Sequence, residues 1–294
     1  MDNLLICSSG LVDRQRNQRP SYSTVVSIFN KEKDPIFNAG SYSERTPLIY
    51  IIMGIILCLI ILYLINRFKR FREYLFRAFL RPYNFYADIR DQRIISNVQT
   101  LLLGLVISIT FSLFTTSVFY YYKSSETAQY IYMLLLPFTF IQEYFYNLIW
   151  SPELFVITLS ILLFGLIFLI SLIIKLFSFF VKGRIFYTDT YTITIWSAVP
   201  VLLLLPFTIV LNKLLMLAPD VIWLIILILI IIIFWILFRI IRATAVVFDI
   251  RPMYSYIFGF SFIALIITLL ISIYQIQFSL FSYTQYLFSV LLNY

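Results

Sequence analysis

Long apolar runs separated by short polar connections dominate the chain from residue 47 onward. Six of these runs can cross a bilayer core, which takes about 20 helical residues; they cover 47–65, 98–121, 152–181, 191–217, 221–238 and 254–276. None alternates like a barrel strand, and each exceeds the roughly 9–11 residues that such a strand uses. The pattern therefore predicts an all-α, polytopic membrane protein with six transmembrane helices.

The same pattern divides the chain into five segments. Residues 1–47 form a polar segment of mixed charge, and residues 48–66 form the first transmembrane helix. A basic amphipathic connection follows at 67–95, then a membrane domain of five helices at 96–277, and finally an uncharged tail at 278–294.

The stretch 130–150 is ambiguous. Its apolar part is short, contains Pro137 and is followed by Gln142, Glu143 and Asn147. A full span would bury the Glu143 carboxylate, which is costly in a bilayer. The aromatic residues around it suit the membrane interface, where amphipathic rings gather. We expect a helix in the interface, or a shallow re-entrant turn, in preference to a seventh span.

Composition and charge agree with a membrane protein and predict its orientation. Of 294 residues 62% are hydrophobic and 12% charged, against about 45–50% and about 25% in soluble domains. The net charge of +8 is concentrated in the connections 67–95, 175–190 and 239–253, whereas the alternate connections hold only Lys123 and Lys213. Short basic loops face the cytoplasm. We therefore predict a multi-pass protein of the cell membrane with both termini outside.

Several kinds of catalytic chemistry are excluded by composition. The chain has no histidine, only Cys7 and Cys58 as cysteines, and seven glycines without a phosphate-binding cluster. Histidine-dependent catalysis, zinc sites and nucleotide-binding loops therefore have no residues to build them. We expect no enzyme, no catalytic residue, no cofactor, no metal and no nucleic-acid partner.

Charges and prolines within the apolar runs favour structural roles. The basic residues near the ends of the runs are expected to extend to the interface; they are Lys175, Lys213, Arg239 and Arg242. No ionisable group lies clearly in mid-span, which disfavours an ion-coupled transporter. Pro200 and Pro206 are expected to kink the fourth span, with Ser197 or Thr208 bonding the carbonyls that are freed.

The connection 67–95 alternates basic and aromatic residues at helical spacing. Phe68, Phe71, Leu75 and Phe79 can share one face. This pattern is typical of a helix lying on a membrane, with apolar side chains sunk and basic ones reaching anionic headgroups. The candidate lipid-headgroup residues are Arg67, Lys69, Arg70, Arg72, Arg77 and Arg81. Alternatively, these charges only set the topology.

Three segments between about Arg81 and Ile273 form a recognisable pattern. They are RPYNFYADIRDQR before the first of five spans, GRIFYTDTYTITIWSAVPVLLLLP with Ser197, Ala198 and Pro200, and FRIIRATAVVFDIRP before the last span. In these segments the chain resembles the Yip1 family of five-span membrane proteins. The resemblance implies a five-helix bundle, preceded here by an extra span, that organises membranes or scaffolds partners without catalysis. No residue supports binding of a GTPase.

A second resemblance covers residues 10–30, GLVDRQRNQRPSYSTVVSIFN. This segment is similar to the last strand, loop and helix of a family 2 glycoside hydrolase barrel, with Pro20 at the helix start. It implies that the chain is the membrane-anchoring end of an extracytoplasmic glycoside hydrolase, whose paired carboxylates would lie upstream. The other interpretation is a free polar tail.

The leading hypothesis is thus a non-enzymatic Yip1-like membrane protein, with the glycoside hydrolase anchor as the alternative. A small-solute transporter is the third hypothesis. The expected partners are the lipid bilayer, with anionic lipids as candidates, and membrane-protein partners or a second copy of the chain.

Overall fold

The computed structural model describes residues 20–31, 47–91, 96–125, 128–129, 131–132, 138–181 and 185–278, with the single residues 11, 18 and 136. The elements in these ranges are all helices. The chain divides into two units, Met1–Arg45 and Thr46–Tyr294. In the first unit the described helix is α1 (Pro20–Asn30). It begins at Pro20, as predicted, because proline lacks the N–H that a first helical residue leaves unused.

The second unit contains six helices long and apolar enough to cross a membrane, which confirms the predicted number within the described ranges. Four are single helices: α2 (Leu48–Arg67), α5 (Asn97–Tyr121), α8 (Pro152–Phe177) and α12 (Pro252–Phe278). The fourth span combines α9 (Tyr187–Ser197), η2 (Val199–Leu204) and α10 (Leu205–Leu217). The fifth combines η3 (Pro219–Val221) and α11 (Ile222–Val247).

Shorter helices connect the spans: α3 (Lys69–Leu80), α4 (Pro82–Arg90), α7 (Thr139–Trp150) and η1 (Ser178–Phe180). With 12 residues, α7 is about 18 Å long, against a bilayer core of about 30 Å. It is therefore no span, in agreement with the prediction for 130–150. Phe145 of α7 packs against Phe119 of α5 and Phe155 of α8, at centroid distances of 5.5 and 5.6 Å.

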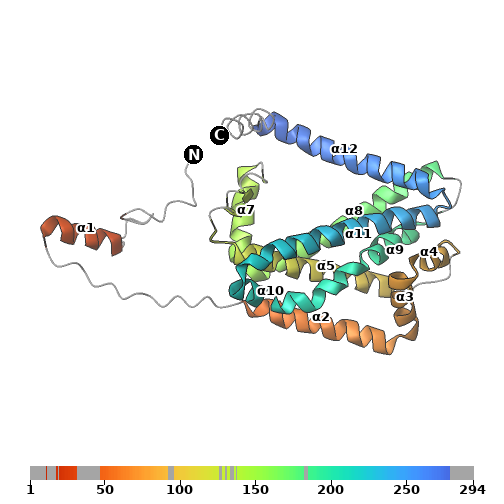
Figure 1. Ribbon diagram of the computed structural model, residues 1–294, viewed down its shortest axis with the longest axis horizontal. Helices are drawn as coiled ribbons and strands as arrows, with labels where there is room; N and C mark the ends of the chain where they lie inside the picture. Colours follow the sequence, from red (N-terminus) through yellow and green to blue (C-terminus); the bar gives the residue numbers. More distant parts are fainter. Residues whose placement is uncertain are drawn as a thin grey trace. The chain divides into compact units, whose positions relative to one another are not determined.

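The helix α5 and the fourth span form the interior of the second unit. More than half of the positions in each are buried, against less than a quarter in the other four spans. The helix α5 packs on α8, α9 and α10, and α9 also contacts α8 and α11 (Figure 1). At the α5–α9 contact a Cβ on Gly104 would lie 2.8 Å from Cδ1 of Ile195. The missing side chain lets these two helices approach closely.

The fourth span is broken where the prolines predict it. Pro200 lies in the 3₁₀ segment η2, and Pro206 lies in the first turn of α10. Thr208 donates its hydroxyl to the carbonyl of Leu205 at 2.7 Å, which is not one of the carbonyls that Pro200 and Pro206 free, so the expected bond from Thr208 is not found. Ser197 instead shares a 2.9 Å hydrogen bond with the hydroxyl of Tyr86 in α4.

The last two spans differ in length from the prediction. The helix α11 continues nine residues beyond the predicted end at 238, so that Arg239 and Arg242 lie within it. The helix α12 contacts α11 at Gly259, where a Cβ would lie 2.8 Å from Ile241 Cγ1, and through a 3.0 Å bond between Ser255 and Thr244. The predicted tail beyond Phe278 lies outside the described residues.

The basic connections 67–95 and 239–253 meet at the same end of the bundle. Arg90 at the end of α4 forms a 3.2 Å ion pair with Asp249, which lies in the turn between α11 and α12. We call this end the basic end. Toward the opposite end, Lys123 places its ammonium 3.9 Å from the Tyr120 ring centroid and 4.9 Å from that of Trp150.

Candidate functional site

The candidate site is the elbow formed by α3 and α4, together with Arg67 at the end of α2; this region contains the predicted lipid-headgroup residues. Phe68 is extended, with φ −115° and ψ 96°, and separates α2 from α3. The second break is at Arg81, with φ −133° and ψ 61°, directly before Pro82 at the start of α4. Proline has no N–H and disfavours helical geometry in the preceding residue. The local sequence therefore bends the chain twice within this connection.

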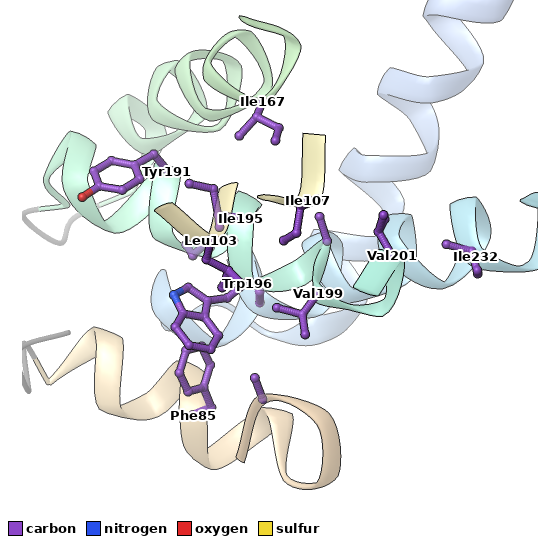
Figure 2. Close-up of a cluster of buried hydrophobic side chains, with 14 of the residues drawn as sticks. Phe85, Leu103, Ile107, Ile167, Tyr191, Ile195, Trp196, Val199, Val201 and Ile232 are labelled. Carbon is purple, nitrogen blue, oxygen red and sulfur yellow. The ribbon is translucent and has the colours of Figure 1, made fainter. Parts of the chain in front are cut away.

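The inner face of the elbow packs into the bundle. Figure 2 shows Trp196 of α9 directed toward Phe85 of α4, and the two ring centroids are 4.8 Å apart. Phe71 of α3 lies 5.9 Å from the same indole ring. The indole N–H donates to the hydroxyl of Thr100 at 3.2 Å. Trp196 is thus enclosed by α3, α4 and α5.

This packing corrects the predicted orientation of the amphipathic face. Phe71 is fully buried, and Leu75 and Phe79 also pack against the protein core, so this face covers the bundle and does not enter lipid. The apolar side chains that α3 presents outward are Phe76, 59% exposed, and Leu80, 77% exposed. The spacing of apolar residues indicates that a helix face lies in apolar surroundings. It does not distinguish the protein interior from lipid, because either one removes the face from water.

The outer face carries most of the predicted headgroup residues. Five of the six are exposed and form no ion pair within the described ranges: Arg67, Lys69, Arg70, Arg72 and Arg81. The sixth, Arg77, forms a 3.0 Å ion pair with Asp88 of α4. We call these five residues, with Phe76 and Leu80, the outer face of the elbow.

Arg90, at the same end, is already paired. The hydrogen bond from Arg90 to Asp91, followed by the charges of Asp91 and Asp249, raises the pKa of Arg90 above its ordinary value. Arg93 lies outside the described residues. The outer face therefore gathers five exposed basic side chains without an ion pair in the described ranges, whereas Arg242 and Arg251, also exposed at this end, belong to α11 and to the turn after it.

The elbow is held to the bundle by Arg239 of α11, a residue whose place near the end of an apolar run predicts a side chain at the membrane interface. The prediction was wrong, because Arg239 is only 6% exposed. Its Nη2 donates to the carbonyl of Ala78 at 2.8 Å and to that of Trp196 at 3.2 Å. One guanidinium thus joins α11, the elbow and the broken span.

Two prolines explain why these two carbonyls are free. A helical carbonyl accepts the N–H four residues later; that residue is Pro82 for Ala78 and Pro200 for Trp196. Neither proline can donate, and a buried carbonyl without a donor costs about 1–3 kcal/mol. The sequence contains the relevant features, namely two residues placed four positions before a proline and one arginine near a span end. It does not indicate that the arginine contacts those two residues.

Chemically, the outer face can donate several hydrogen bonds to phosphate oxygens and can place two apolar side chains beside them. Within the described ranges, no three cysteine, aspartate or glutamate side chains are grouped so as to hold a metal ion.

Comparison with known protein families, with curated proteins and with solved structures finds no match for this chain. The resemblances to the Yip1 family and to the glycoside hydrolase segment therefore rest on the sequence patterns alone.

Proposed function

We propose that the protein is a non-enzymatic, Yip1-like membrane protein that organises the bilayer or scaffolds partners, with its basic end toward the cytoplasm. The outer face of the elbow binds anionic lipid headgroups of the inner leaflet of the cell membrane. Its partners are the lipids and, within the membrane, other proteins or a second copy of the chain.

The observation that carries this proposal is the combination of exposed charge and exposed apolar surface on one helix. Arg72, Phe76 and Leu80 follow one another at intervals of four residues on α3, and all three are exposed. Residues at this spacing lie on the same helix face. Such a face suits a membrane surface, since each base near an anionic leaflet contributes about 1 kcal/mol.

Arg239 argues against an ion-coupled transporter. In transporters with broken helices, carbonyls freed at the break coordinate the coupling cation. Here the carbonyl freed at Pro200, that of Trp196, accepts a hydrogen bond from the guanidinium of Arg239. The protein itself thus supplies the cation at this position.

The lipid preference is measured with full-length protein in bilayers containing trace spin-labelled phosphatidylglycerol or phosphatidylcholine. The motionally restricted fraction of each labelled lipid reports its association with the protein. We expect a preference for phosphatidylglycerol that falls several-fold in Arg70→Glu/Arg72→Glu, because two attractive charges become repulsive. Arg77 is left unchanged, because it already pairs with Asp88.

The matched control is Lys213→Glu, a reversal of an exposed base on α10, near the end of the bundle opposite the elbow. This variant should keep the preference for phosphatidylglycerol when the leaflet around Lys213 contains little anionic lipid. Equal lipid selectivity in wild type and in the double variant would overturn the lipid proposal and leave the arginines as topology signals.

The orientation has its own test. In a Cys7→Ser/Cys58→Ser background, an impermeant thiol reagent applied outside cells should label Ser124→Cys but not Arg251→Cys. Both positions are exposed, and they lie toward opposite ends of the bundle. Labelling of Arg251→Cys alone would reverse the assignment.

One observation favours the alternative, a membrane anchor of an extracytoplasmic glycoside hydrolase. The helix α1 begins at Pro20, where that resemblance expects the last barrel helix to begin. Sequencing the transcript upstream of Met1 tests it. An in-frame barrel sequence would support the anchor, whereas a stop codon directly before Met1 would remove it.

A further inference from the structure

Two buried polar side chains near the end of the bundle opposite the basic end have no hydrogen-bond partner among the described residues. Asn212 of α10 is 4% exposed, and neither its amide nitrogen nor its amide oxygen is bonded within the described part of the chain. Ser117 of α5 is fully buried, and its hydroxyl is likewise unbonded. Leaving such atoms unpaired costs about 1–3 kcal/mol each.

The helix α2 places these two residues at the same depth. A Cβ on Gly54 of α2 would lie 3.4 Å from the hydroxyl of Thr208, which is one turn before Asn212 on α10. Tyr50 lies one turn before Gly54 on α2, and its hydroxyl donates to the carbonyl of Thr116 at 3.2 Å. Because α2 and α10 run antiparallel, one turn back on α2 matches one turn forward on α10. Tyr50, Asn212 and Ser117 therefore share one level.

Neighbouring hydroxyls on the same helices donate their protons to backbone carbonyls. Thr110 donates to the carbonyl of Val106 at 2.8 Å, and Thr116 donates to that of Ser112 at 2.7 Å. Thr208 donates to the carbonyl of Leu205. The buried polar side-chain atoms of α5 and α10 without a partner in the described ranges thus belong to Ser117 and Asn212, which lie at one level on two helices that pack together.

We propose that Asn212 and Ser117 form a water-binding site between α2, α5 and α10. The asparagine amide offers both donors and an acceptor, and the serine hydroxyl offers one donor and an acceptor, which is the pattern that water matches. Ser117 lies four residues from the end of α5, about 6 Å along the helix. Water reaches this depth from the end of the bundle opposite the elbow.

The site is closed toward the middle of the bundle. Leu113 lies one turn below Ser117 on α5, and Leu205 lies two turns below Asn212 on α10; both are buried in a cluster with Val106 and Leu57. These apolar side chains bound the proposed water site on the side that faces the break at η2. The inference is independent of the lipid-binding proposal, because the two sites lie toward opposite ends of the bundle.

The test is the reactivity of a substituted cysteine in full-length protein in proteoliposomes, in a Cys7→Ser/Cys58→Ser background. A thiol reacts with methyl methanethiosulfonate as the thiolate, which forms only where water reaches it. We expect Ser117→Cys to react at least about tenfold faster than Thr110→Cys. Thr110 is the matched control because it is equally buried on α5, two turns deeper.

A second comparison ties the water to Asn212. Asn212→Leu, which has a similar volume and no polar atoms, should slow the modification of Ser117→Cys to the rate of Thr110→Cys. Thr208→Val should leave it unchanged. Equal rates for Ser117→Cys and Thr110→Cys would overturn the proposal, and that comparison stands even if Asn212→Leu fails to fold. An unchanged rate in a folded Asn212→Leu protein would also overturn it.

Discussion

The guanidinium of Arg239 donates to the carbonyl of Trp196 at 3.2 Å, one helical turn before Pro200. The same nitrogen donates to the carbonyl of Ala78, one turn before Pro82. A single buried side chain therefore completes the hydrogen bonding of two proline breaks that lie more than 100 residues apart in the sequence.

Replacing Arg239 by methionine should lower the free energy of unfolding by about 2 kcal/mol, because two buried carbonyls lose their donor. The cost of burying the guanidinium, whose Nε has no partner, offsets part of the loss. Titration with SDS in mixed micelles measures the change. The control is Arg242→Met on the exposed side of α11, which should stay within about 0.5 kcal/mol of wild type. Wild-type stability of Arg239→Met would show that other donors reach these carbonyls.

Gly104→Ala should destabilise the protein by about 1–2 kcal/mol, since the new methyl group would overlap the buried Ile195 side chain. The atom in the way is Ile195 Cδ1, at 2.8 Å. Ile195→Val removes that atom and should restore part of the stability in the double variant. Gly165→Ala is the control, because nothing lies within 4 Å of the added atom. Equal effects of the two alanine substitutions in the same micelle assay would contradict the close contact.

The bond between Tyr86 and Ser197 predicts a non-additive pair. The two hydroxyls are 2.9 Å apart and buried, so Tyr86→Phe alone should cost about 1 kcal/mol by leaving Ser197 without this partner. The double variant with Ser197→Ala should cost less than the sum of the single changes. A double-mutant cycle on unfolding free energies measures the coupling. Strict additivity would mean that the bond contributes nothing.

The turn after α11 contains a strained backbone. Asp249 has a φ of 53°, a backbone conformation that residues other than glycine seldom adopt. Asp249→Gly should therefore be as stable as wild type or slightly more stable, since its ion pair with Arg90 is exposed and contributes little. Asp249→Val should lower stability by about 1–2 kcal/mol. Thermal unfolding followed by circular dichroism ranks the three proteins, and a valine variant as stable as the glycine variant would refute the strain.

The sequence predicted those features that depend on length and on local chemistry. Hydropathy alone gave six spans, Pro200 and Pro206 located the break in the fourth one, and Pro20 located the start of α1. It also favoured an interfacial helix or a re-entrant turn over a span at 130–150, because an interrupted apolar run with Glu143 is a poor span; the helix described there, α7, has only 12 residues.

What could not be predicted depends on which neighbour each side chain finds. The face with Phe71 was expected in lipid and is covered by Trp196, because apolar spacing does not distinguish the two environments. Arg239 was expected at the interface because it lies near a span end. Its two carbonyl partners lie on other helices, and the sequence does not indicate which helices pack together. Asn212 drew no notice, because an unpaired amide is recognised only once its surroundings are known.

The interior position of α5 and the fourth span has a consequence for biosynthesis. These two segments have the lowest mean hydropathy of the six and bury the largest share of their residues. Each alone is a weaker candidate for partitioning from the translocon into lipid than α2, α8 or α11. Because α5 is synthesised before α8, α9 and α10, we expect its stable insertion to depend on their later arrival. We therefore expect membrane integration of this chain to be coupled to the assembly of its bundle.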